Sequence, residues 1–169
     1  RFTLKADEYD ENRHFLLAQY FRNNYNAAMK KLPVVNSKVQ ILRMEVWVTN
    51  RNGTTTDTRD VIAFMDLGER FPFNNSLTGA GNELPRNDAN SLYATLQSNL
   101  GFRNSSQAQS TLTAQGFLPV QDFEKTFARK LDSTQYYFNR QLGFISLNVT
   151  LQPDEVLAVA YQYTLNGKV

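Results

Sequence analysis

Two segments with alternating apolar residues constrain the fold of this chain more than any other feature. The first segment, residues 38–49, places one set of apolar side chains on a single face: Leu42, Met44, Val46 and Val48. The last segment, residues 155–165, does the same with a second set: Leu157, Val159, Tyr161, Tyr163 and Leu165. A period of two residues is typical of β-strands, and Val and Tyr favour them. The framework of the fold is therefore expected to be a β-sheet.

Further strands are predicted beside these two. Residues 61–67 are apolar on both faces, which predicts a central strand that forms a hairpin with the first segment across the polar loop 50–58. Residues 142–151 alternate in the same way and are expected to pair with the last segment across the turn at Pro153. Arg1–Ala6 reads as a short strand as well.

Helical periodicity separates the two expected hairpins and also follows the first strand. Residues 11–32 predict a long helix with Asp10 as its N-cap and with one apolar stripe toward the sheet: Leu17, Phe21, Tyr25, Ala28 and Leu32. Residues 70–88 have no period, and three helices are expected after them: 92–100, with Asn87 as cap and Gly101 as C′ residue, then 106–115 and 122–131. The fold class is thus predicted as α+β, with an antiparallel sheet or sandwich of about five strands and helices inserted between two hairpins.

Residues 1–169 are expected to form a single domain, with a variable helical insertion at about 70–121. Asn166-Gly167 is a strong signal for a two-residue hairpin turn, yet only Lys168 and Val169 follow it. The chain also opens without Met. We interpret it as a domain excised from a larger protein, the alternative being a processed or trimmed whole protein.

Composition excludes several classes of function. Lys and Arg number 18 against 16 Asp and Glu, and no run of basic residues is present, so a nucleic-acid partner is not expected. No apolar run approaches the roughly 18 residues that a membrane-spanning helix needs. The chain has no cysteine, which removes disulfides, thiol catalysis and Cys-ligated zinc.

Catalytic, cofactor and metal sites are not expected either. His14 is the single histidine and falls in the first turns of the predicted helix, where a hydrogen-bonded or solvated role is the expected one. The chain has no G-x-S-x-G elbow and no phosphate-binding G-x-x-x-x-G-K-[ST] loop. Asp60 and Asp66 are interpreted as strand-end carboxylates that meet solvent or a partner such as Arg43, and the spacing of a calcium loop is missing around Asp57.

One set of residues is a candidate for interaction: Trp47 with Arg43 and Glu45, which share the second face of the first strand. In one interpretation this face is exposed and Trp47 contacts a protein or stacks on a sugar. In the other, a helix covers the face and buries Trp47. The second is the expected arrangement, because the long helix must pack somewhere and the sheet is the obvious place.

Three stretches resemble, in this order, segments of the SprA/Sov family of gliding motility and type IX secretion: "ILRMEVWVTNRNGTTTDTRDVIAFMDLGE", "LDSTQYYFNRQLGFISLNVTLQPDEVLAVAYQYTLNGKV" and "YDENRHFLLAQYFRNNYNAAMKKLPVVNS". The resemblance covers nearly the whole chain and is weakest over 70–121. Family members are very large outer-membrane β-barrel translocons with soluble inserts, and the resemblance implies that this chain is one such insert. No functional residue of the family maps onto it.

The resemblance implies a non-enzymatic structural and protein-interaction domain at the outer membrane or cell surface, with the periplasmic face as the open alternative. Its expected partners are the rest of its own large parent chain and other secretion-system subunits or secreted cargo. A carbohydrate-binding or adhesin module on the cell surface is the alternative function, motivated by Trp47 and the eight tyrosines.

Overall fold

The computed structural model describes residues 3, 5, 8–50, 58–79 and 83–168, and it confirms the α+β class. The helices are α1 (Gln19–Met29), α2 (Leu92–Ser98) and α3 (Ser105–Ala114), with a 3₁₀ turn η2 (Leu100–Arg103) between the last two. The strands are β1 (His14–Leu16), β2 (Val39–Thr49), β3 (Thr58–Phe64), β4 (Phe123–Lys130), β5 (Tyr136–Asn139), β6 (Phe144–Leu147) and β7 (Leu157–Leu165). The strand expected at Arg1–Ala6 falls mostly outside the described residues; Thr3 and Lys5, which are described, lie in no strand.

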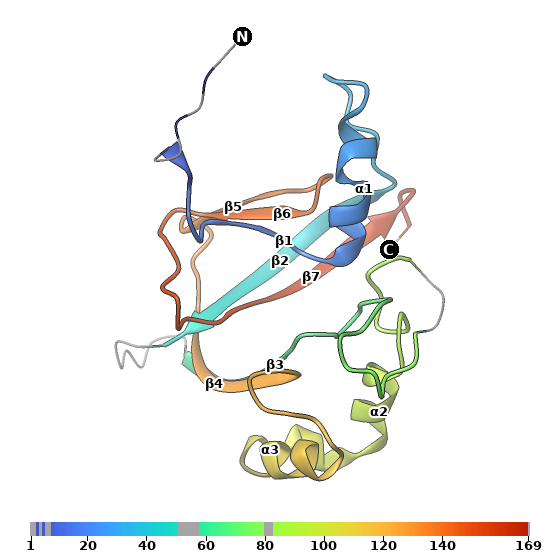
Figure 1. The fold of residues 1–169 in the computed structure, drawn as a ribbon, viewed down its shortest axis with the longest axis vertical. Coiled ribbons are helices and arrows are strands. Elements are labelled where there is room, and N and C mark those ends of the chain that lie inside the picture. Colours follow the sequence, from blue (N-terminus) through green and yellow to red (C-terminus); the bar gives the residue numbers. More distant parts are fainter. Residues whose placement is uncertain (1–2, 4, 6–7, 51–57, 80–82, 169) are drawn as a thin grey trace.

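The strands form two antiparallel sheets, one of four strands in the order β3-β4-β2-β7 and one of three in the order β1-β6-β5. Figure 1 shows the smaller sheet beside the long strands β2 and β7, and α2 and α3 gathered at the other end near β3 and β4. The core between the sheets is apolar and buried: Met44, Val46, Val48, Leu131, Ile145 and Leu147. Burial of this surface is the main force that holds the two sheets together.

A β-bulge in β2 changes which side chains of the first strand are buried. Met44, Val46 and Val48 are buried as predicted, but Leu42 is 38% exposed. The register of β2 against β7 shifts between Ile41 and Arg43, so Leu42 is the extra residue and Ile41 takes the buried position before it. An inserted residue reverses the alternation on its N-terminal side, which a strict period of two cannot reveal.

Both predicted hairpins are wrong: β4 separates the two strands of the first, and the two strands of the second belong to different sheets. β4 lies between β2 and β3, so β3 is an outer strand of the described sheet and not a central one. β7 pairs with β2, whereas β6 pairs with β1 and β5 in the other sheet. The helix predicted at 122–131 is β4: the spacing of Phe123 and Phe127 fits a helix, but pairing on both sides imposes a strand.

The long helix predicted at 11–32 is also shorter than expected. α1 begins only at Gln19, and His14 lies in β1, where Phe15 pairs with Ile145 of β6. Asp10 is therefore not the N-cap. The residue before the helix, Ala18, has no capping side chain, and Glu69 from a distant loop accepts the hydrogen bond of the Gln19 N–H instead.

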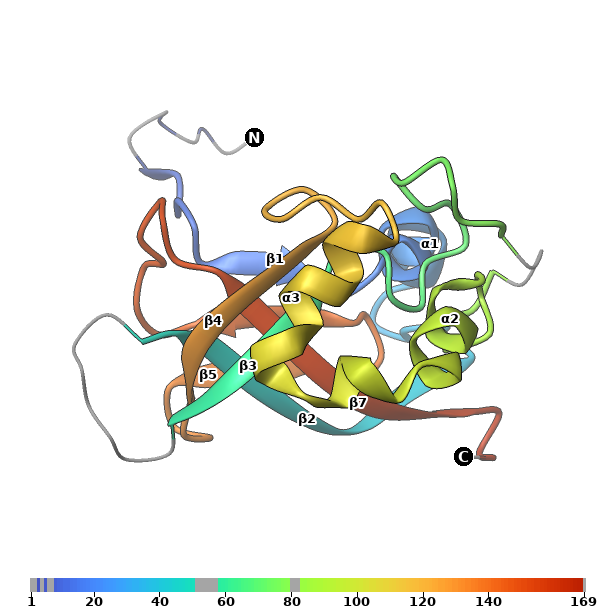
Figure 2. The ribbon, with the colours of Figure 1, turned by 90° about the horizontal axis from the view of Figure 1, so that it is seen from below.

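The described residues between 65 and 121 (65–79 and 83–121) form a compact excursion that covers the outer face of β3 and β4. As predicted, residues 70–79 and 83–88 are irregular, and a helix, α3, follows near 106–115. The buried cluster that joins the excursion to β4 is apolar: Leu92, Leu112, Phe117 and Phe123. Asn87 does not cap α2, because the Leu92 N–H donates to Asn90 Oδ1, and Gly101 lies within η2 rather than after a helix. Figure 2 shows α3 across β3 and β4.

The turn predicted at Asn166-Gly167 is confirmed. Both residues have positive φ, 49° and 80°, as a type I′ hairpin turn requires. Leu165 N–H donates to the Lys168 carbonyl at 2.7 Å, and Lys168 N–H donates back to the Leu165 carbonyl at 3.0 Å. The chain thus reverses direction, and Lys168 pairs with Leu165.

Candidate interaction surface

A hollow of about 500 Å³ lies between the two outer strands of the four-stranded sheet. Its walls are residues 61–65 at β3 and residues 157–161 of β7, with Trp47 of β2 between them. Leu17 and Ala18 before α1, and Pro85 and Asn87, line it too. Residues 67–69 border it as well. Because β3 and β7 are opposite ends of the strand order and still line one space, the sheet curls until its outer strands face each other. We call this hollow the seam.

Trp47 is half-buried at the seam, and two cations, from β3 and β4, flank its ring. The Arg59 guanidinium carbon lies 5.6 Å from the ring centroid and Lys130 Nζ lies 5.9 Å from it. Lys130 is the cross-strand partner of Trp47 in β4, and Ala158 is its partner in β7. Both cations are within the distance at which they are attracted to an aromatic face. The expected covering of Trp47 by the long helix is not found: α1 packs with Val39 and Ile41 on the opposite face of β2.

The flanking cations lead to a prediction for the fluorescence of Trp47, which is the one tryptophan of the chain. We expect iodide to quench it more strongly than caesium, because the local positive charge concentrates the anion. Replacing Lys130 and Arg59 by Gln should bring the two quenching constants together. Equal quenching in the parent protein would show that neither cation lies at the ring.

Of the other two candidate residues, Glu45 lies close to Trp47 and Arg43 does not. Lys130 Nζ donates to Glu45 Oε1 at 2.8 Å, and this hydrogen bond with the Lys130 charge lowers the pKa of Glu45. Arg43 lies on the same face of β2 opposite Gln162, but it does not line the seam. Sequence reasoning missed Lys130 and Arg59, because only the pairing of distant strands places them beside the ring. The local pattern around Lys130 predicts a helix, whereas the structure has β4 there.

The wall at residues 65–69 is held by buried polar side chains. Asp66, 2% exposed, accepts hydrogen bonds from the N–H groups of Phe73 at 2.8 Å and Asn74 at 3.0 Å. Asn90 donates to the carbonyls of Asp66 at 2.7 Å and Glu69 at 2.6 Å. The expectation that Asp66 meets solvent or Arg43 is therefore wrong. The Asp66 carboxylate holds the backbone at Phe73 and Asn74 and so fixes the wall of the seam.

Glu69 connects this wall to α1. Both of its carboxylate oxygens lie within 3.2 Å of the Gln19 N–H at the start of the helix, where the helix dipole favours negative charge. Burial nevertheless raises the pKa of Glu69, as does the nearby charge of Asp66, while the hydrogen bond from Gln19 opposes the rise. The protonated carboxyl is thus favoured more in the folded protein than in the unfolded chain.

This balance predicts a pH dependence of the melting temperature. A raised pKa contributes stability that is complete below the ordinary value of 4.5 and is lost as the pH rises through the folded value. Glu69→Gln keeps an acceptor for the Gln19 N–H without a charge, so it should reduce the loss of stability above pH 4.5. Parallel melting curves of the parent and the variant across this pH range would contradict the assignment.

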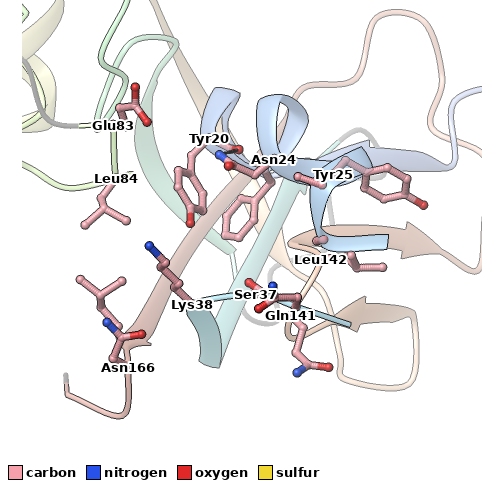
Figure 3. Close-up of a pocket in the computed structure, with 15 residues that line it drawn as sticks. Tyr20, Asn24, Tyr25, Ser37, Lys38, Glu83, Leu84, Gln141, Leu142 and Asn166 are labelled. Atoms are coloured by element: carbon pink, nitrogen blue, oxygen red, sulfur yellow. Dashed lines mark hydrogen bonds between the residues drawn. The ribbon is translucent and has the colours of Figure 1, made fainter. Parts of the chain in front are cut away.

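A second pocket, of about 440 Å³, lies between α1 and the start of β2. Figure 3 shows Tyr20 of α1 and Lys38 facing the same space, with Asn166 and Gln141 at its border. Burial raises the pKa of Tyr20, and the charge of Glu83 contributes to the rise. Amide groups beside aromatic rings are a lining suited to polar ligands with an apolar face, such as sugars.

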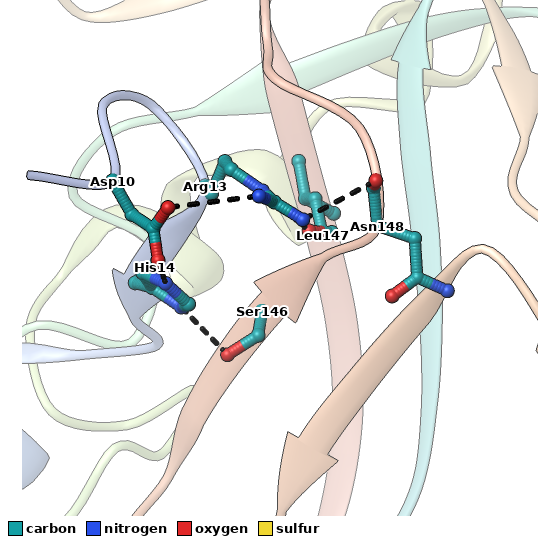
Figure 4. Close-up of polar contacts among 6 residues, drawn as sticks. All are labelled: Asp10, Arg13, His14, Ser146, Leu147 and Asn148. Carbon is teal, nitrogen blue, oxygen red and sulfur yellow. Dashed lines mark hydrogen bonds and ion pairs between the residues drawn. The ribbon is translucent and has the colours of Figure 1, made fainter. Parts of the chain in front are cut away.

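His14 takes part in a polar network that the sequence did not indicate (Figure 4). Its Nδ1 lies 2.8 Å from Ser146 Oγ and its Nε2 lies 3.2 Å from Asp10 Oδ2. The three residue types are those of a hydrolase triad, but the side chains of His14 and Asp10 are 51% and 59% exposed, whereas a triad carboxylate is buried. His14 and Ser146 are cross-strand partners in β1 and β6, so we interpret the network as a surface contact that fixes β1.

Three further findings bear on the kind of site. Among the residues that the structure describes, no three His, Asp or Glu side chains gather closely enough to hold a metal ion. Asp60 lies 3.6 Å from Lys125 in an ion pair, and Asp57 lies outside the described residues. None of the helices in the described ranges has the length and apolar character needed to cross a bilayer.

These features define an α+β domain with a curled sheet and an open seam. Residues 1–71 match the family model SprA_N, described as motility related/secretion protein, which confirms the resemblance for this part of the chain. The description names no enzymatic activity. The match includes Trp47 and Glu45 and ends where the variable insertion was expected to begin; the block 142–169 lies outside it. No curated protein matches the chain.

Proposed function

We propose that the chain is a non-enzymatic structural and protein-interaction domain of a cell-surface type IX secretion and gliding-motility translocon. The match of residues 1–71 to a motility and secretion family supports the assignment of the chain to such a translocon. In this proposal the domain lies within a much larger parent protein at the outer membrane, on the cell surface, with the periplasmic side as the alternative. Its partners are other parts of that parent chain, secretion-system subunits or secreted cargo.

The observation that carries the proposal is the seam. It presents Trp47, Val61 and Leu157 in an open hollow beside two outer strands. Partly exposed apolar surface with an aromatic anchor and a charged rim is typical of protein-docking sites. Lys130, Glu45 and Arg59 supply that rim.

Cross-linking in cells tests this proposal. A photoreactive amino acid replaces Ala160, an exposed residue that lines the seam, and in a matched strain it replaces Ala114, an exposed residue at the end of α3. Mass spectrometry should find Ala160 joined to peptides of the secretion machinery or of the parent chain outside residues 1–169, with Ala114 largely unlinked. Equal labelling at both positions would refute a docking role for the seam.

The pocket of Figure 3 favours a second candidate function, carbohydrate binding, because it combines Tyr20 and Tyr25 with amide side chains. A glycan array with the parent protein and with Tyr20→Ala, Asn24→Ala and Trp47→Ala separates the two functions. Reproducible glycan binding that Trp47→Ala or Tyr20→Ala abolishes would favour the adhesin. Absence of binding across the array would leave the docking function.

A further inference from the structure

β7 has one side that is open to another strand. In an antiparallel sheet, successive residues direct their N–H and C=O groups alternately to the two neighbours. Asn166 N–H donates to Lys38 on the β2 side, whereas Leu165 bonds Lys168 on the other side. Four other residues of β7 share the orientation of Leu165, so their backbone N–H and C=O groups point away from β2: Leu157, Val159, Tyr161 and Tyr163. Within the described ranges, no backbone hydrogen bond reaches these four residues from that side.

Nothing in the sequence of β7 discourages the addition of a strand. Outer strands that resist pairing with a further strand usually carry Pro, Lys or a bulge. Residues 155–165 contain neither Pro nor Lys, and the one irregularity in this pairing is in β2, not in β7. The open side also lines the seam, so the same hollow offers main-chain hydrogen bonds and apolar surface.

The Asn166-Gly167 turn indicates which strand would occupy the seam. Its two hydrogen bonds between Leu165 and Lys168 are the first pair of an antiparallel ladder on the open side of β7. A strand that continued from Lys168 would face Tyr163, Tyr161, Val159 and Leu157 in turn. A second copy is a poorer fit, because residues 61–65 form the opposite wall of the hollow, so the edge of a whole sheet would have to enter between two walls.

We propose that the seam receives one antiparallel strand, supplied in cis by polypeptide that continues from the Asn166-Gly167 turn, and that this strand closes the curled sheet between β7 and β3. The inference rests on the proposed function only in that the domain lies within a larger protein, and it names the occupant of the docking surface. Main-chain bonds to β7 would provide most of the affinity, and alternate apolar side chains would fill the hollow beside Trp47.

Hydrogen exchange of the protein with an added strand tests the inference. Eight residues of alternating Thr and Val are appended after Val169, and in a control chain every second appended residue is Pro. We expect exchange at the amides of Val159, Tyr161 and Tyr163 to slow by at least about tenfold in the first chain only, with an unchanged monomeric mass. Equal exchange in the two extended chains would overturn the proposal, as would slowed exchange that depends on dimerisation.

A variant of the turn shows whether the strand acts in cis through it. Gly167 has φ +80°, and an added Cβ would meet nothing within 4 Å, so Gly167→Val disfavours the turn without a steric clash. The variant should abolish the added protection although the appended strand is intact. Protection that survives Gly167→Val would exclude a strand directed by the turn. Cross-linking at Ala160 in cells is independent of this result, so the two proposals can fail separately.

Discussion

Phe21→Ala is expected to lower the free energy of unfolding by about 3–5 kcal/mol, the usual cost of truncating a buried Phe. Phe21 is 2% exposed and packs with Val39 and Ile41 of β2. Its ring also lies 6.3 Å, centroid to centroid, from that of Tyr161 in β7. The truncation therefore leaves a cavity where α1 joins the sheet. Chemical denaturation of the parent and the variant measures the difference.

A second substitution identifies the cause of this loss. Gly143 has φ +65°, and a Cβ there would overlap the ring of Phe21. Gly143→Ala alone should destabilise strongly, through both overlap and backbone conformation. In the Phe21→Ala background the overlap disappears, so the two effects should be non-additive by 0.5–3 kcal/mol, as for other contacting pairs. Additive effects, or a Phe21→Ala variant with the melting temperature of the parent, would show that α1 does not cover the core.

Asn90→Ala is expected to have the second-largest effect, about 2–5 kcal/mol, because it leaves buried polar groups without partners. Asn90 is 4% exposed, donates to the carbonyls of Asp66 and Glu69, and accepts from the Leu92 N–H. Losing these hydrogen bonds should loosen residues 66–69, which form a wall of the seam, from the rest of the excursion.

Asn90→Asp provides the matched control for this position. The carboxylate keeps an acceptor for Leu92 but removes both donors, so the variant separates the two halves of the network. We expect it to be destabilised as well, with increased proteolysis at residues 70–79. Urea denaturation and limited proteolysis give both quantities. Wild-type stability of both variants would contradict the role assigned to Asn90.

Local patterns predicted the parts of the fold that depend on nearby residues. The α+β class, the buried positions Met44, Val46 and Val48, the helix near 106–115 and the turn at Asn166-Gly167 are all confirmed. Each depends on side-chain alternation or on the φ preference of a few neighbouring residues.

The pairing of strands could not be predicted in the same way. The spacing of Phe123 and Phe127 predicts a helix where the structure has β4, because the partners of this strand, β2 and β3, are far away in the sequence. The bulge at Leu42 and the tertiary capping of α1 by Glu69 also depend on distant contacts. Propensity is a weak guide wherever tertiary contacts decide.

Only part of the candidate site could be predicted from the sequence. Trp47 and Glu45 were identified from their face of the first strand, and the structure places both together. The cations and the opposite wall belong to β3, β4 and β7, so the seam exists only once the sheet has curled. No pattern within one segment contains that information.

The central claim is that the seam is the working surface of a secretion and motility domain. Two identical changes test it in cells that carry the domain in its native protein: Val61→Glu on the wall of the seam, and Val149→Glu at a position 53% exposed outside it. With both proteins at equal abundance, we predict that Val61→Glu impairs type IX cargo secretion and gliding while Val149→Glu leaves them normal. Normal secretion and gliding in both strains would contradict the claim.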